Sequence, residues 1–103
     1  MSLESEFTLA LEGTITAAKK RGYVPTIFMQ MLAEHGAVET ARRLLSTSEP
    51  QTGLYQLWDL GLLQESMEAA IWDNPRFHQF FTPVEIGEAY RRLEELNYFK
   101  QKK

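Results

Sequence analysis

The two histidines are the residues of this sequence best suited to proton transfer or metal binding. His78 lies in the segment DNPRFHQFFTPVE, among three phenylalanines and two prolines. A catalytic imidazole needs a hydrogen-bonding partner that orients it. No carboxylate occurs at the neighbouring positions on a helix, which are Asn74, Pro75, Phe81 and Thr82. The segment therefore indicates a packed corner between helices, with a structural or solvent-exposed role for His78 rather than a catalytic one.

His35 stands directly before Gly36, at a predicted helix end. A protonated imidazole there would interact favourably with the negative end of the helix dipole, so we predict a structural role for it too. No G-x-S-x-G signature marks a nucleophile, although spacing alone leaves a Ser-His-Asp triad open. We assign no catalytic residue and predict that the protein is not an enzyme.

Metal and cofactor sites are not indicated. The absence of cysteine excludes disulfides, thiolate zinc sites and a cysteine nucleophile. Glu65, Glu68 and Asp73 surround one short predicted helix, but no His-Glu-x-x-His or calcium-loop pattern supplies further ligands. The six glycines are scattered and most of them end helices, unlike those of a phosphate-binding loop. We predict no metal and no cofactor.

Positive charge is clustered, and it could contact phosphate groups. The first and last clusters fall at predicted helix ends, where cations stabilise the dipole, and this accounts for them without a ligand. If two clusters lie on one face, contact with a nucleic-acid backbone becomes feasible. The net charge of −3 argues against non-specific coating of DNA. The clusters are Lys19, Lys20 and Arg21; Arg42 and Arg43; Arg91 and Arg92.

The two tryptophans suggest different environments. Trp58 follows the apolar pair Leu54 and Leu57, so we predict that it lies in the core. Trp72 adjoins Asp73 on a short helix whose inward face is already supplied by other apolar residues. We therefore predict that Trp72 is the more exposed of the two and contacts a partner.

The elements that would position these residues are helices. In residues 1–21, apolar residues recur at three- and four-residue steps behind the N-cap Ser2, with Glu4 and Glu6 in the first turn. Three glycines end helices, and each is followed by an apolar residue that folds back on another five positions earlier. The glycines are Gly22, Gly36 and Gly61, and the pairs are Tyr23 with Ala18, Ala37 with Leu32, and Leu62 with Leu57.

Further helices are predicted from caps and stripes. A short helix covers Val38 to Leu45, and residues 46–53 form an exposed loop in which Ser48 and Gln51 suit a capping box. Ser66 caps another short helix. Asn74-Pro75 and Thr82-Pro83 repeat a cap followed by proline at the first helical position. They begin a short helix over 75–81, with Phe77, Phe80 and Phe81 on one face, and a long last helix over 83–96.

The predicted last helix has distinct faces. Its solvated face carries Glu88, Glu94 and Glu95, and Glu88 pairs with Arg91 and Arg92. Its inward stripe is Val84, Ile86, Ala89, Tyr90, Leu93 and Leu96.

Three strings carry a resemblance: GYVPTIFMQMLAEHGAVETARRLLS, GLYQLWDLGLLQESME and NPRFHQFFTPVEIGEAYRRLEEL. Together they resemble a small uncharacterised bacterial all-helical domain family, stand-alone or appended to larger proteins, some of which process DNA. The resemblance covers residues 22–96 and implies a fold rather than a site. The matching residues are Gly22, Tyr23, Pro25, Thr26, Phe28, Leu44, Leu45, Leu57, Trp58, Phe81, Thr82 and Glu85.

These observations predict an all-α, compact single-domain bundle of roughly five to seven helices over residues 1–103, with long first and last helices and a basic tail at 97–103. No membrane span or signal peptide is apparent, and a cytoplasmic protein is expected. The expected function is a non-enzymatic protein-interaction module whose protein partner is unknown. The alternative is an accessory nucleic-acid-binding domain of a DNA-processing system that uses Arg42, Arg43 and the Lys19–Lys20–Arg21 cluster.

Overall fold

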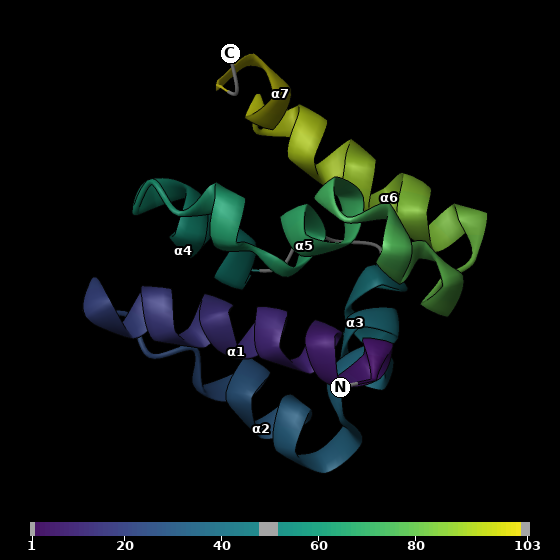
Figure 1. Ribbon diagram of the computed structural model, residues 1–103. Coiled ribbons are helices and arrows are strands. Elements are labelled where there is room, and N and C mark those ends of the chain that lie inside the picture. Colours follow the sequence, from purple (N-terminus) through teal and green to yellow (C-terminus); the bar gives the residue numbers. More distant parts are fainter. Residues whose placement is uncertain (1, 48–51, 102–103) are drawn as a thin grey trace.

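Helix α1 (Leu3–Lys20) is the element on which the first half of the fold is assembled. The computed structural model describes residues 2–47 and 52–101. In it, α1 packs against α3 (Ala37–Leu45) and α5 (Met67–Asp73), and it crosses the molecule below α4 (Thr52–Asp59) and α5 in Figure 1. The Ser2 hydroxyl accepts a hydrogen bond from the Ser5 amide, which confirms the predicted N-cap. The buried side chains of α1 recur at the predicted three- and four-residue steps, and they are Phe7, Leu11, Thr14 and Ala18. Leu3, the first residue of the predicted stripe, is half-buried.

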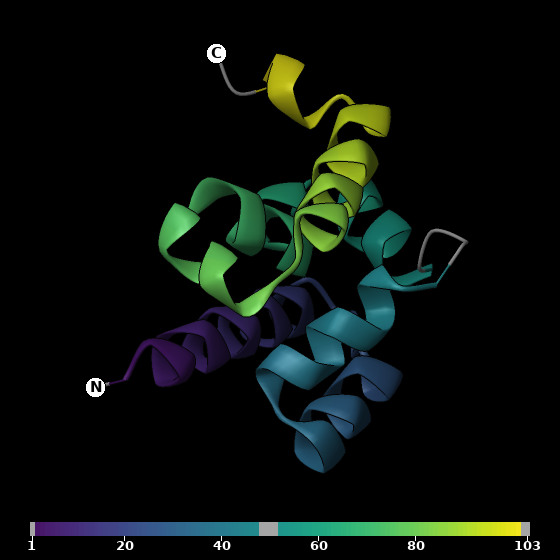
Figure 2. The same ribbon diagram turned by 90° about the vertical axis from the view of Figure 1, so that its right-hand side faces the viewer.

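The described residues contain helices and no strand, which confirms the all-α class. The radius of gyration is 12.6 Å, close to the value of roughly 13 Å expected for a folded chain of this length. Figure 2 shows α6 and α7 stacked above the layer formed by α1, α2 and α3. The remaining elements are α2 (Thr26–His35), α4 (Thr52–Asp59), the 3-10 helices η1 (Leu63–Glu65) and η2 (Pro75–Phe80), α6 (Pro83–Glu95) and α7 (Tyr98–Gln101).

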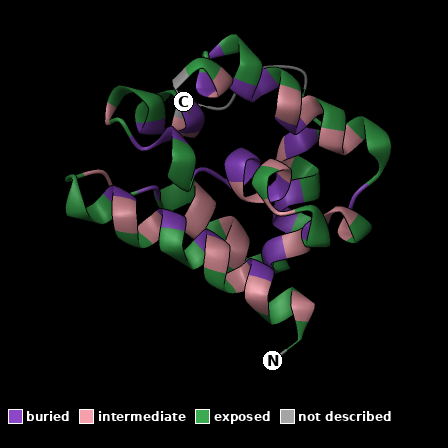
Figure 3. Cartoon of the chain, turned by 45° about the horizontal axis from the view of Figure 1, so that its top comes forward, coloured by how far each residue is buried: buried purple, intermediate pink, exposed green. Residues whose placement is uncertain are grey.

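The main core surrounds the ring of Phe7. Its centroid lies 5.1 Å from that of Phe77, 6.1 Å from that of Phe80 and 5.6 Å from that of Phe81. The prediction of a packed corner in this segment is therefore confirmed. Figure 3 shows the buried positions recurring along the helices between exposed ones, as expected for amphipathic elements around a core.

Two of the three predicted glycine stops have the expected geometry. Gly22 and Gly61 have φ of 83° and 73°. The following amides fold back: Tyr23 donates to the Ala18 carbonyl at 3.0 Å, and Leu62 donates to the Leu57 carbonyl at 2.8 Å.

Gly36 ends its helix differently. With φ 81° and ψ 169°, Gly36 joins α2 directly to α3, and its own amide donates to the Leu32 carbonyl at 3.0 Å. Since α3 begins at Ala37, the predicted hydrogen-bonded fold-back of that residue is replaced by a sharp turn between two helices.

Two of the predicted N-terminal helix caps in residues 66–85 are present, and one is not. The capping box of Thr82 and Glu85 is present, and Ser66 accepts from the Ala69 amide at 3.1 Å. The Asn74 side chain does not cap η2, because its amide donates back to the Ala70 carbonyl at 2.8 Å. The helix that follows it is a 3-10 helix ending at Phe80 rather than an α-helix.

The C-terminal part corrects three expectations. Helix α6 ends at Glu95, Asn97 adopts φ 62°, and α7 follows where a basic tail was predicted. The last helix is therefore short, and it is anchored by Tyr98, which is buried. Val84, placed in the predicted inward stripe, is 82% exposed because it lies in the first turn of α6, beyond the core.

The predicted loop over 46–53 is shorter than expected at its end, since α4 already begins at Thr52. The predicted capping box of Ser48 and Gln51 lies outside the described residues.

Candidate docking pocket and buried arginine network

An apolar cavity of about 400 Å³ lies between α1, α2 and α4. The C-terminal half of α1 contributes Thr14 and Ala18, and Leu44, Met67 and Glu68 close it from α3 and α5. Most of the rest of its lining is apolar: Tyr23, Val24, Pro25, Ile27, Phe28, Met31, Leu54 and Leu57. We call this cavity the α2–α4 pocket. Its volume falls within the range of roughly 300–1,000 Å³ that is typical of binding pockets.

The position of α2 keeps the pocket open. Gly22 and Pro25 separate α2 from α1, and not one residue of α2 is buried. Val24 and Ile27 line the pocket, yet they are 55% and 75% exposed, so they stand at its open side. Large apolar side chains exposed together at a recess are typical of a binding surface.

The opposite wall is α4. Leu54 and Leu57 are buried and line the pocket, whereas Tyr55 and Trp58 are 37% and 44% exposed. The prediction that Trp58 lies in the core is therefore wrong. Leu57 fills, together with Leu62, the apolar cluster around Ala18, and this leaves no buried position for the indole.

Trp72 is half-buried within an aromatic cluster. Its ring centroid lies 4.7 Å from that of Tyr90 and 6.1 Å from those of Phe99 and His78. The prediction that Trp72 is the more exposed tryptophan is wrong, because α7 brings Phe99 against it. Sequence reasoning had placed Phe99 in a tail.

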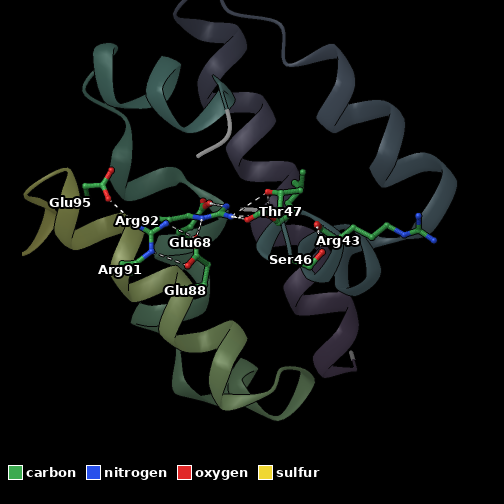
Figure 4. Close-up of polar contacts among 9 residues, drawn as sticks. Arg43, Ser46, Thr47, Glu68, Glu88, Arg91, Arg92 and Glu95 are labelled. Atoms are coloured by element: carbon green, nitrogen blue, oxygen red, sulfur yellow. Dashed lines mark hydrogen bonds and ion pairs between the residues drawn. The ribbon is translucent and has the colours of Figure 1, made fainter. Parts of the chain in front are cut away.

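Arg92 joins three segments of the chain and is only 2% exposed (Figure 4). Its Nε donates to Glu88 at 2.6 Å and its Nη1 to Glu68 at 3.2 Å. Its Nη2 donates to the carbonyl oxygens of Leu44 at 3.0 Å and Thr47 at 3.2 Å. The network therefore ties α6 to α5 and to the C-terminal end of α3.

This network was missed by the sequence analysis, which placed Arg92 in an exposed basic cluster and Glu88 on a solvated face. The expectation for Arg92 is wrong, and Glu88 is only partly solvated, since 20% of its side chain is exposed. A signal was present: Arg92 lies three residues after Ala89 and four before Leu96, within the inward stripe of α6. The predicted pairing of Glu88 with both arginines is confirmed.

The electrostatics of the network indicate a structural role. Burial raises the pKa of Glu68, although the Arg92 charge opposes this shift. Hydrogen bonds from Arg91 and then Arg92 lower the pKa of Glu88 to about 2. All three guanidinium nitrogens of Arg92 donate within the protein, so the side chain holds the fold together instead of presenting donors to an anion.

The other predicted basic residues are spread over the surface. Arg42 pairs with Glu85 at 3.2 Å, and Arg43 pairs with Glu39 at 2.9 Å. Arg21 donates from Nη1 to the Leu60 carbonyl at 3.0 Å. Lys19 and Lys20 are exposed, and neither has an ion-pair partner among residues 2–47 and 52–101.

His78 Nε2 lies 2.9 Å from the Ile71 carbonyl oxygen, which agrees with a structural role. His35 is exposed, 3.9 Å from Glu34. The described residues contain no group of three or more His, Cys, Asp or Glu side chains suited to a metal ion. They also contain no helix long and apolar enough to cross a bilayer.

Comparisons of the chain with models of protein families, with curated proteins and with solved structures gave no match. The resemblance to a bacterial all-helical domain family therefore stays a prediction.

Proposed function

We propose that this protein is a non-enzymatic interaction module that binds an apolar segment of a partner protein in the α2–α4 pocket. The observation that supports it is a recess of about 400 Å³ whose open side carries Val24 and Ile27, 55% and 75% exposed. Contact with a partner would remove this apolar surface from water, which stabilises a complex by roughly 25 cal/mol for each Å² buried.

The shape of the pocket suits side chains presented by a helix. Its two long walls, α2 and α4, are themselves helices, and recognition of this kind uses anchor residues spaced three or four positions apart. Anchors with aromatic or large aliphatic side chains in such pockets dominate binding energies.

The proposal is tested by comparing two variants in affinity capture from the cells that produce the protein. Ile27→Glu places a charge at the pocket, and Leu9→Glu does the same at a 51% exposed residue that is not part of it. We expect that some proteins captured by the wild type are no longer recovered with Ile27→Glu but are still recovered with Leu9→Glu. Equal recovery with both variants and the wild type would contradict the proposal.

A nucleic-acid-binding domain is the less favoured alternative. Of the residues on which it was based, Arg42 and Arg43 are each paired with a glutamate, which reduces the charge available to phosphates. The exposed Lys19 and Lys20 are the part of the alternative that these ion pairs leave in place. We further propose a cytoplasmic location, with which the cysteine-free composition agrees.

A further inference from the structure

The walls of the α2–α4 pocket differ in charge from one of its ends. Residues 22–33, which include the α2 wall, contain no Asp, Glu, Lys or Arg, and neither do residues 52–58 of the α4 wall. Three consecutive cations, Lys19, Lys20 and Arg21, lie between Ala18 and Tyr23, both of which line the pocket.

We call residues 19–21 the cationic end of the pocket, and this segment adjoins both walls. Arg21 donates to the Leu60 carbonyl at 3.0 Å, just beyond the last residue of α4, while the chain continues through Tyr23 into α2. Lys19 and Lys20 precede Arg21 in the last turn of α1 and are exposed. Asp59 is the one acid in residues 52–62, against the three cations of residues 19–21, although the whole chain carries a formal charge of −3.

We infer that the partner segment is an amphipathic helix with an apolar face and acidic residues at one end, which lie over Lys19 and Lys20. This inference rests on the proposed function and specifies its partner. Complementary charges at the rim of an apolar contact orient the partner and accelerate association more than they add affinity. The α2 and α4 walls, which are uncharged, take the apolar anchors, and Glu68, the charged residue of the lining, is paired with Arg92. The cationic end fixes the direction in which the helix lies.

An anionic membrane is the other class of partner that apolar and basic groups can attract, and two observations argue against it. Helices that lie on membranes carry Lys and Arg along their polar face, whereas α2 has the sequence TIFMQMLAEH with neither residue. The apolar groups also line a recess between helices, which accepts protruding side chains rather than a flat surface.

The inference is tested by selecting binders from a displayed library of random peptides of about 15 residues, a length that allows a short helix. The affinities of the selected peptides are then measured for the wild type and three variants. Ile27→Glu blocks the pocket, and Lys19→Glu/Lys20→Glu reverses the cationic end. Arg42→Glu/Arg43→Glu makes the same change in net charge elsewhere, so it serves as the matched control.

We expect binders with apolar residues at helical spacing and acidic residues at one end. Their binding should be lost with Ile27→Glu, weakened about tenfold with Lys19→Glu/Lys20→Glu, and little changed with Arg42→Glu/Arg43→Glu. Circular dichroism melts of each variant would establish that these losses do not come from unfolding.

The failures are distinguishable. Peptides that need Ile27 but are indifferent to Lys19→Glu/Lys20→Glu, or equally weakened by the control, would overturn the inference and leave the proposed function standing. If the selection yields no peptide whose binding depends on Ile27, both the inference and the proposed function are overturned. Binding to vesicles of anionic phospholipid that is lost with Ile27→Glu, in the absence of peptide binders, would assign the surface to a membrane and overturn both as well.

Discussion

At the scale of single residues, Arg92 has the largest structural role. It is almost fully buried, and it compensates the carboxylate of Glu68 across the contact between α5 and α6. When one member of such a pair is removed, the other charge stays buried without compensation, and this is more destabilising than the pair itself is stabilising.

We therefore expect Arg92→Met to lower the free energy of unfolding by about 3–5 kcal/mol. The neighbouring Arg91→Met should lower it by less than about 1 kcal/mol, because the ion pairs of Arg91 with Glu88 and Glu95 are exposed to solvent. Urea denaturation of the two variants gives the comparison. Equal losses would show that the Arg92 network does not hold the helices together.

Stability should also depend on Glu88 in acid. The pKa of Glu88 is lowered to about 2, so its stabilising contribution is complete above its ordinary pKa and is lost as the pH falls towards 2. Glu68, whose pKa is raised, acts in the opposite direction, since its contribution is complete at low pH and is lost as the pH rises. The difference in the pH dependence of stability between the wild type and a Glu88 variant isolates the contribution of Glu88.

We predict that Glu88→Gln reduces the loss of stability between neutral pH and pH of about 2.5 by on the order of 1 kcal/mol relative to wild type, a figure reduced for the partial exposure of the group. Glu94→Gln on the exposed side of α6 serves as the control. Chemical denaturation at a series of pH values provides the measurement. The prediction fails if both variants have the wild-type pH dependence.

The residue scale is also where sequence reasoning was least accurate. Trp58 was expected to be buried and Trp72 exposed, but Trp58 is the more exposed of the two. The exposure of each tryptophan depends on which distant segment covers it. The apolar cluster around Ala18 is filled by Leu57 and Leu62, and Phe99 covers Trp72. Local periodicity contains no information about such long-range contacts.

At the scale of elements, helix ends were predicted well because they depend on a few adjacent residues. Ser2, Ser66 and Thr82 cap as expected, and Gly22 and Gly61 end helices in the left-handed region. Elements whose form depends on tertiary contact were predicted poorly. η2 is a 3-10 helix that ends one residue before Phe81 and lacks a cap from the Asn74 side chain, which bonds back to α5. The aromatic residues of α7 pack against α5 and α6 where a tail was predicted.

Two glycines provide a matched test of these helix ends. Gly22 has φ 83°, where a side chain is strained, whereas Gly13 is helical and a Cβ added there meets no atom within 4 Å. We expect Gly22→Ala to destabilise the protein by about 1 kcal/mol and Gly13→Ala to stabilise it by about 0.5–1 kcal/mol. Thermal melting of both variants and the wild type measures these changes in stability. Stabilisation by Gly22→Ala would contradict the left-handed stop.

At the scale of the whole molecule, the fold class could be predicted because the sequence shows helical periodicity and no strand pattern. The candidate site could not, since the pocket requires α1, α2 and α4 to be placed in space. The basic clusters were similarly ambiguous: sequence alone could not show that Arg42 meets Glu85, 43 positions away in the chain.

The charge distribution gives a prediction against the alternative function. Because both α3 arginines are ion-paired, we expect no salt-sensitive binding to duplex DNA or single-stranded RNA, even in low salt, at micromolar protein. Fluorescence anisotropy with labelled oligonucleotides is the assay. Binding that weakens steeply with salt and is lost with Arg42→Glu/Arg43→Glu or with Lys19→Glu/Lys20→Glu would favour the nucleic-acid alternative.

The most direct test of the central claim, that the α2–α4 pocket receives a partner protein, is site-specific photo-crosslinking in living cells. A photoreactive phenylalanine derivative replaces Ile27 in one variant and Leu9 in another, both exposed residues of helices. We expect one or a few discrete protein adducts from position 27 and none of them from position 9. The same adducts from both positions, or none from position 27 in cells that express the protein, would contradict it.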